Sequence, residues 1–154
     1  GHDPHLLAWS PAHPDVIWQQ NHHGVYRSDD GAASWVEVSA PELGVLFGFP
    51  VAVDLRDPDR AWVIPAKSDE MRAAIGGRLR VCRTEDGGRS WTSLGEGLPQ
   101  QACYDLVYRH AFAQRGDVLA FGSTTGNLFM SKDGGERWAA LAHCLPPIYS
   151  ARFA

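Results

Sequence analysis

The sequence predicts an all-β protein made of repeated four-stranded sheets. An eight-residue box with the pattern hydroxyl-x-Asp-Gly-x-x-x-Trp occurs three times, at 28–35, 84–91 and 131–138. Short β-rich runs such as Val16-Ile17-Trp18 are bounded by Pro, Asp and Gly. The 16 Gly, 10 Pro and 6 Trp residues are typical of many short strands joined by turns.

The repeated unit extends beyond the box. Pro14-Asp15 upstream of the first box matches Pro58-Asp59 upstream of the second. The box tryptophans are 56 and 47 residues apart, and the second unit carries 12 extra residues within 65–77. Without them the first period is 44 residues, and periods of 44 and 47 residues are typical of four-stranded β-propeller blades. We therefore predict a single, partial β-propeller domain over 1–154, with blades at about 5–38, 49–94 and 104–141.

Each blade is expected to contain four antiparallel strands in chain order. The expected strands are 5–9, 16–18, 24–27 and 35–38 in the first blade, 50–55, 61–64, 79–84 and 91–94 in the second, and 104–109, 118–122, 127–131 and 138–141 in the third. After Pro146-Pro147, residues 148–153 have the pattern of one more innermost strand.

Composition excludes several classes of function. With 14 basic and 18 acidic residues the net charge is −4, and no basic block could follow a phosphate backbone, so nucleic acid is not an expected partner. Cys82, Cys103 and Cys144 are odd in number and lack CxxC spacing, which favours a reducing, cytoplasmic location. No apolar run approaches about 20 residues, so no membrane span is expected. The alternative of a secretory leader that was removed earlier stays open.

The three boxes resemble the Asp-box, or BNR, repeat of sialidase-type β-propellers. The wider repeat is similar to bacterial proteins described as exo-α-sialidase-like or BNR-repeat glycosyl hydrolase-like. Similar boxes occur in sortilin-type receptors and in some xyloglucan-degrading enzymes. The resemblance implies a propeller fold and, because the repeat occurs on unrelated activities, no single function.

The resemblance places each box at the turn between the third and fourth strands of a blade. Its aspartate is expected to accept from backbone N–H groups two residues on, and its tryptophan to pack into the blade. These residues are Asp30, Trp35, Asp86, Trp91, Asp133 and Trp138. The alternative role, as calcium ligands or glycosidase carboxylates, is disfavoured because catalytic carboxylates must converge to within about 5–10 Å. Ala32 and Arg137 depart from the box pattern and predict looser turns.

The opposite ends of the strands are expected to form a ligand-binding face, because loops between second and third strands and between blades meet there. The polar candidates on this face are Asn21, His22, His23, Lys67 and Arg72. The residues after the second strand of the second blade could form a lid over a polar ligand. The alternative is a solvated, charged loop.

A divalent metal is a second possibility at this face, and no other cofactor is expected. His2, Asp3 and His5 precede the first strand, and His22 and His23 follow the second, so imidazole and carboxylate ligands could converge. The alternative is a group of surface histidines.

Sialidase chemistry, which the resemblance raises, needs a tyrosine nucleophile, carboxylates and arginines that hold an anionic sugar. The candidates are Tyr104, Asp105, Asp69 and Glu70, with Arg72, Arg109 and Arg152 as cations near the axis. Phe47-Gly48-Phe49-Pro50 lacks the arginine of the sialidase Phe-Arg-Ile-Pro signature, which disfavours that activity.

The sequence therefore favours a non-catalytic binding module for a glycan or protein ligand, with a sialidase-like glycoside hydrolase as the alternative. Three blades leave two open apolar faces, whereas propellers close with 4–8 blades. The expected partners are the remaining blades of a larger propeller or a second copy of the chain.

Overall fold

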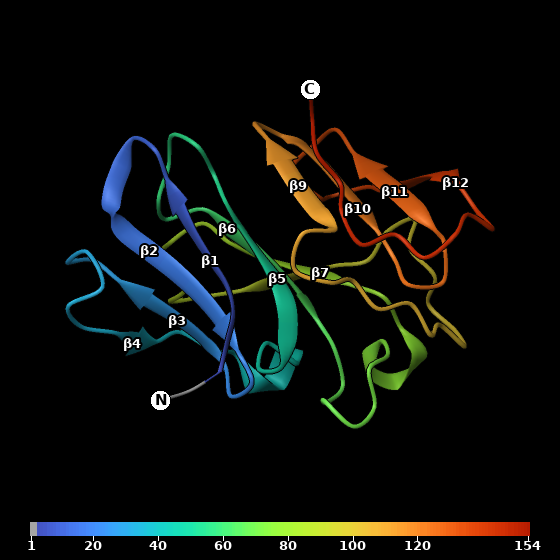
Figure 1. Cartoon of the computed structure of the whole chain (residues 1–154), viewed down its shortest axis with the longest axis horizontal. Helices are drawn as coiled ribbons and strands as arrows, with labels where there is room; N and C mark the ends of the chain where they lie inside the picture. Colours follow the sequence, from blue (N-terminus) through green and yellow to red (C-terminus); the bar gives the residue numbers. More distant parts are fainter. Residues whose placement is uncertain (1–2) are drawn as a thin grey trace.

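The computed structural model describes residues 3–154 and contains three four-stranded antiparallel sheets (Figure 1). Blade 1 consists of β1 (Pro4–Ser10), β2 (His13–Asn21), β3 (Val25–Ser28) and β4 (Val36–Glu37). Blade 2 consists of β5 (Gly48–Val53), β6 (Ala61–Pro65), β7 (Val81–Thr84) and β8 (Thr92–Leu94). Blade 3 consists of β9 (Phe112–Arg115), β10 (Val118–Gly122), β11 (Leu128–Ser131) and β12 (Ala139–Ala142). The short 3-10 helices η1 (Pro41–Leu43) and η2 (Ile75–Gly77) lie in connections.

The strand order confirms the predicted all-β architecture. Each sheet runs in simple chain order, from β1 to β4, β5 to β8 and β9 to β12. β5 contacts both β1 and β9, so the first strand of each sheet lies innermost (Figure 1). Among residues 3–154, no helix is long and apolar enough to cross a membrane.

The innermost strand of blade 3 lies later in the chain than expected. Residues 104–109 form no strand, and β9 instead pairs with β10 through a hairpin in which Val118 lies opposite Arg115. The two intervening residues are Gly116, at a φ of 60°, and Asp117, which together suit a two-residue turn. The 104–109 segment is still anchored, because its Leu106 and Val107 are buried.

The last residues of the chain run beside blade 3. Residues 148–153 do not form a regular strand, but Ser150 makes a parallel bridge with His110, and the Ala151 N–H donates to the His110 carbonyl at 2.8 Å. Ile148 lies directly over Gly122, where a Cβ would overlap it. The tail thus follows the inner edge of blade 3, as expected of the first strand of a further blade.

The three box turns share one hydrogen-bond pattern. In the second box the Thr84 hydroxyl accepts the N–H of Gly88 and donates to Asp86, whose carboxylate accepts both the N–H and the hydroxyl of Ser90. The aspartate therefore reaches four residues forward rather than the expected two, because it must span the whole loop between two strands. The first box has the same bonds around Asp30.

The two departures from the box pattern have separate outcomes. Ala32 adopts a φ of 75°, the left-handed conformation that glycine tolerates more easily. At Asp133 the N–H of Arg137 still donates at 3.0 Å, but Arg137 has no hydroxyl to give a second bond. The hydroxyl bonds of Ser34 and Ser90 help to lower the pKa of Asp30 and of Asp86 to about 2, while the pKa of Asp133 is lowered chiefly by its bond from the Arg137 N–H.

Indole N–H groups join each blade to the next. The fully buried Trp18 donates to the Pro58 carbonyl at 2.9 Å, and the equally buried Trp62 donates to the Gly134 carbonyl at 3.0 Å. The box residue Trp91 donates to the Val38 carbonyl of blade 1 at 2.8 Å. Trp138 is buried against Phe121 of its own blade, and Trp35 is half-buried.

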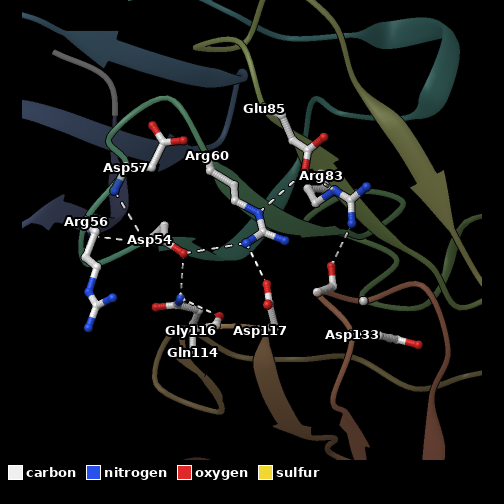
Figure 2. Close-up of polar contacts among 12 residues, drawn as sticks. Asp54, Arg56, Asp57, Arg60, Arg83, Glu85, Gln114, Gly116, Asp117 and Asp133 are labelled. Carbon is white, nitrogen blue, oxygen red and sulfur yellow. Dashed lines mark hydrogen bonds and ion pairs between the residues drawn. The ribbon is translucent and has the colours of Figure 1, made fainter.

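A network of charged groups joins blades 2 and 3 beside the box turns (Figure 2). The Arg60 guanidinium forms ion pairs with Asp117 at 2.7 Å, Glu85 at 3.5 Å and Asp54 at 3.7 Å, and it lies over the Trp62 ring. Arg83 reaches Glu136 of blade 3 at 2.7 Å. The pairs to Asp117 and Glu136 thus link blade 2 to blade 3 on the side of the molecule where the box turns lie.

Candidate ligand-binding face

The loops opposite the box turns gather at one edge of the molecule. The β2–β3 turn, the β4–β5 connection with η1 and the β6–β7 connection with η2 all lie at the lower edge in Figure 1. The β4–β5 and β6–β7 connections are tied together, because the Ala66 N–H donates to the Phe47 carbonyl at 2.9 Å. The extra residues predicted within 65–77 do form the β6–β7 connection, which we call the insert (66–77).

A cluster of mainly aromatic side chains packs beneath the loops of this edge, on their interior side. Phe47, Phe49 and Leu106 form a buried cluster with Ala66 of the insert, and Tyr108 packs against it. Phe47 and Phe49 are in edge contact at 5.3 Å between ring centroids, and Phe49 and Tyr108 at 5.0 Å. This aromatic cluster gives the polar loops a rigid apolar base.

Most of the predicted ligand-binding residues meet in one hollow. The histidine hollow, of about 240 Å³, is lined by His22, His23, Phe47, Lys67, Ser68, Asp69 and Glu70. The β2–β3 turn supplies the two histidines, and the insert supplies the last four residues. The structure thus brings together two loops that are more than 40 residues apart in sequence.

Arg72 lies in a neighbouring hollow. This arginine hollow, of about 500 Å³, is lined by Arg72, Tyr108, Arg109, His110 and Tyr149. The guanidinium groups of Arg72 and Arg109 lie 5.6 and 5.3 Å from the centre of the Phe49 ring. Arg72 also pairs with Asp69. Within residues 3–154 Arg109 forms no ion pair with a carboxylate, so it leaves a positive charge at this edge of an acidic protein.

Two candidate residues are instead used inside the fold. The Asn21 side chain is fully buried, and its oxygen accepts the N–H groups of His23 and Gly24, which shapes the β2–β3 turn. The buried Asp105 carboxylate accepts from Thr125 at 2.6 Å and from Asn127 at 2.8 Å, so it holds the β10–β11 loop. Burial opposes ionisation of Asp105, but hydrogen bonds from Cys103, Ser123, Thr125 and Asn127 outweigh it and lower the pKa.

Tyr104, the proposed nucleophile, does not meet Asp105 in a cavity. Tyr104 is exposed, and it lines neither of the two hollows. The Cys103 thiol donates to Asp105 at 2.9 Å, and burial raises the pKa of Cys103 to about 12, so this cysteine stays a neutral thiol.

The histidine and aspartate candidates for a metal do converge. One donor atom from each of Asp3, His5 and His22 lies within 4.8 Å of the others. His22 Nε2 is 3.8 Å from the Asp3 carboxylate, and the rings of His5 and His22 are 4.6 Å apart. His2, which the sequence also proposes, lies outside the described residues.

Several residues at this face were not predicted from the sequence. Phe47, Tyr108 and Tyr149 line the two hollows, and Phe49 lies under both arginines. The available signal was the clustering of large side chains in Phe47-Gly48-Phe49 and Tyr108-Arg109-His110. Sequence alone assigned the second of these runs to the end of a strand.

Comparison with solved structures shows the β-propeller fold. An ancestral GH74 enzyme matches with a TM-score of 0.68 and 21% identity over 92% of this chain and 18% of that chain. The GH74 xyloglucanase from Xanthomonas campestris matches with a TM-score of 0.65 and 22% identity, over 90% and 20%. YCF48 bound to D1 peptide matches with a TM-score of 0.61 and 16% identity, over 96% and 42%.

The chain therefore spans about a fifth of the GH74 enzymes and less than half of YCF48. No protein-family model matches the sequence, and no curated protein does. These identities support a shared fold and carry no activity over to this chain.

Proposed function

We propose that this chain is part of a larger Asp-box β-propeller and acts as a non-catalytic scaffold that binds a carboxylate-bearing ligand. The main support is the convergence of the β2–β3 turn and the insert over one aromatic cluster, with two adjacent hollows. The unpaired cysteines Cys82, Cys103 and Cys144 support the further proposal of a reducing, cytoplasmic location.

The contact between blades 1 and 2 indicates how a further blade would dock. Blade 1 presents Val38, whose carbonyl accepts from Trp91 and whose side chain lies against Gly88 of the second box. Arg27 reaches across to Asp59 at 2.5 Å. A hollow between the blades is lined by Arg27, Asp29, Val36, Val38, Asp59, Asp86, Gly87 and Arg89.

Blade 3 presents the corresponding surface without a blade on it. Counted from the box, Met130, Ala139 and Leu141 occupy the positions of Arg27, Val36 and Val38. They line an apolar hollow of about 400 Å³, and Leu141 is 53% exposed. Because the same positions bury a box turn between blades 1 and 2, this face suits the box turn of a following blade.

Blade 1, at the other end of the chain, also has a residue placed to contact a further blade. Asp59 and Asp117 occupy corresponding hairpins, and each pairs with an arginine of the preceding blade. Asp15 is the equivalent residue of blade 1, and in the part of the chain that the structure describes it forms no ion pair. An arginine from a preceding blade, or from a second copy of the chain, would complete the pattern.

The proposed ligand chemistry follows from the arginine hollow. A planar guanidinium can hold a carboxylate through two hydrogen bonds, and aromatic rings beneath it keep it in place. Within residues 3–154 Arg109 has no carboxylate partner, and Asp69 is the only carboxylate that pairs with Arg72. The ligand could present its carboxylate on an acidic sugar or on a peptide.

A glycoside hydrolase is the second candidate, because Asp69 and Glu70 both line the histidine hollow. A glycosidase acid needs a raised pKa so that it stays protonated. The pKa of Glu70 is lowered instead, by hydrogen bonds from its own backbone N–H and from Ser68, and Asp69 is engaged by Arg72. These features favour binding over hydrolysis.

Titrations followed by amide NMR test the binding proposal. The probes are a sialylated lactose and a short peptide with a free carboxyl terminus, each compared with its neutral counterpart, lactose or the amidated peptide. We expect at least one charged probe to shift resonances of the insert and of 108–110. Arg109→Ala should weaken that binding at least tenfold.

The matched control is Arg56→Ala, because Arg56 is exposed on the β5–β6 turn at the box side. Binding of neither charged probe, equal binding of the neutral probes, or an equal loss in Arg56→Ala would contradict the proposal. Turnover of a fluorogenic glycoside that disappears in Glu70→Gln would favour the hydrolase instead.

A further inference from the structure

We propose that Asp3, His5 and His22 form a binding site for one divalent transition-metal ion, with Zn²⁺ as the reference ion. The site lies where β1 begins and β2 ends, beside the aromatic cluster. It is a property of the chain beyond the proposed scaffold function.

His5 is held in the form that binds metals. Its Nδ1 lies 2.6 Å from the Gly48 carbonyl oxygen, and because a carbonyl can only accept, Nδ1 must carry the proton. With the proton on Nδ1, the lone pair of the neutral imidazole lies on Nε2. A backbone carbonyl bonded to one ring nitrogen is the usual partner of a metal-binding histidine.

The remaining nitrogen of His5 has no other use. Within residues 3–154 the buried Nε2 has no hydrogen-bond partner, and the ring is stacked on Phe49 at 4.5 Å. A buried polar atom without a partner destabilises the folded state, so native proteins rarely keep one without a reason. A metal ion would give this atom a partner.

The side chains of His22 and Asp3 lie close to the His5 side chain. The three donor atoms are within 4.8 Å of one another, and His22 Nε2 is 3.8 Å from Asp3. Donors at the usual zinc distances of about 2.0–2.2 Å are separated by about 3.3–3.6 Å in a tetrahedron. The Asp3 and His22 side chains are 68% and 33% exposed, so they can close this difference by rotation while His5 stays fixed.

Two imidazoles and one carboxylate select a class of ion. This donor set suits Zn²⁺ and similar transition metals, whereas Ca²⁺ and Mg²⁺ require mainly oxygen ligands. Three protein ligands leave a fourth position for water or for a donor from a ligand. His22 also lines the histidine hollow, so the fourth position would be open to a molecule bound there.

Zinc competition against a chromophoric chelator, with the untagged 154-residue chain, tests the site. We expect one Zn²⁺ per chain, with affinity reduced at least tenfold in His22→Ala and in Asp3→Asn. His13→Ala is the matched control, because His13 is an exposed histidine at the start of β2 and should leave the affinity unchanged. Ca²⁺ should not compete.

A second measurement separates metal binding from folding. Thermal unfolding without metal should be unchanged in His22→Ala and Asp3→Asn, while the rise in Tm that Zn²⁺ gives the wild type should be lost. Co²⁺ should give the visible absorption of a tetrahedral site in the wild type and in His13→Ala only. Zinc binding that is absent, or that survives in His22→Ala, would overturn the proposal.

Discussion

The carboxylates of the box turns show how one residue can stabilise a loop. Asp30 and Asp86 each accept a backbone N–H and a serine hydroxyl from four residues ahead, which closes the turn between two strands. All these bonds require the ionised form of the carboxylate or favour it. Protonation in acid is thus expected to weaken these hydrogen bonds and to make the box turns less stable.

The direction of this acid effect follows from the pKa values. The folded-state pKa of Asp30 and of Asp86 is about 2, below the ordinary value of 3.8. Their contribution to stability is therefore complete above pH 3.8 and is lost as the pH falls toward 2. We expect Tm to fall over this interval, and to fall less steeply in the Asp30→Asn/Asp86→Asn double variant.

Calorimetry from pH 5 to pH 2 measures this prediction. Asp15→Asn provides the control, since the Asp15 carboxylate lies outside the box turns and should leave the wild-type profile unchanged. The prediction fails if the double variant and the wild type lose the same number of degrees.

At the scale of the elements, the local sequence pattern predicted the positions of most strands. One strand, the first of blade 3, lies elsewhere because of tertiary contacts. Residues 104–109 have strand-like composition, yet Asp105 turns inward to hold the β10–β11 loop, and β9 forms three residues after the segment ends. The hairpin at Gly116-Asp117 was a usable signal for β9, since two-residue turns with a positive φ select adjacent paired strands.

The contact between blades 2 and 3 depends on Arg60. Arg60→Met keeps an apolar stem over Trp62 but removes the ion pairs to Asp117, Glu85 and Asp54. Because Arg60 is four-fifths buried, we expect a loss of about 1–3 kcal/mol in the free energy of unfolding. This corresponds to a fall of roughly 2–10 °C in Tm.

Arg56→Met is the comparison for urea and thermal unfolding. Arg56 is exposed, and it is the backbone N–H rather than the side chain that bonds to Asp54, so replacing the side chain should change stability by less than about 0.5 kcal/mol. A double-mutant cycle of Arg60→Met with Asp117→Asn should show coupling. Additive effects would mean that this ion pair does not join the blades.

For the molecule as a whole, three exposed apolar residues lie on the faces where further blades are expected. Leu7 is 47% exposed and Trp9 is 54% exposed on blade 1, and Leu141 is 53% exposed on blade 3. Exposed apolar patches of this kind mark interaction surfaces. The isolated chain should consequently bury them by association.

We expect light scattering after size-exclusion chromatography to show a mass that rises with the concentration of the isolated 154-residue chain. Trp9→Arg should shift the equilibrium toward monomer. Tyr104→Arg makes the same kind of change at an exposed aromatic residue outside these faces, and should leave association unchanged. A monomer at every concentration would count against this account of the open faces.

The sequence by itself determined the repeat, the three sheets and the positions of the box turns. It could do so because these depend on contacts within one unit of about 45 residues. It also assigned His22, Lys67 and Glu70 to one face, since strand alternation dictates which loops share an end.

Only the tertiary structure decided which of those residues meet. Packing of blade 1 against blade 2 places the insert beside the β2–β3 turn and buries His5 against Gly48 and Phe49, and the β10–β11 loop engages the Asp105 carboxylate. These contacts join segments that are 20 to 45 residues apart, and the spacing of residue types within a repeat carries no information about them.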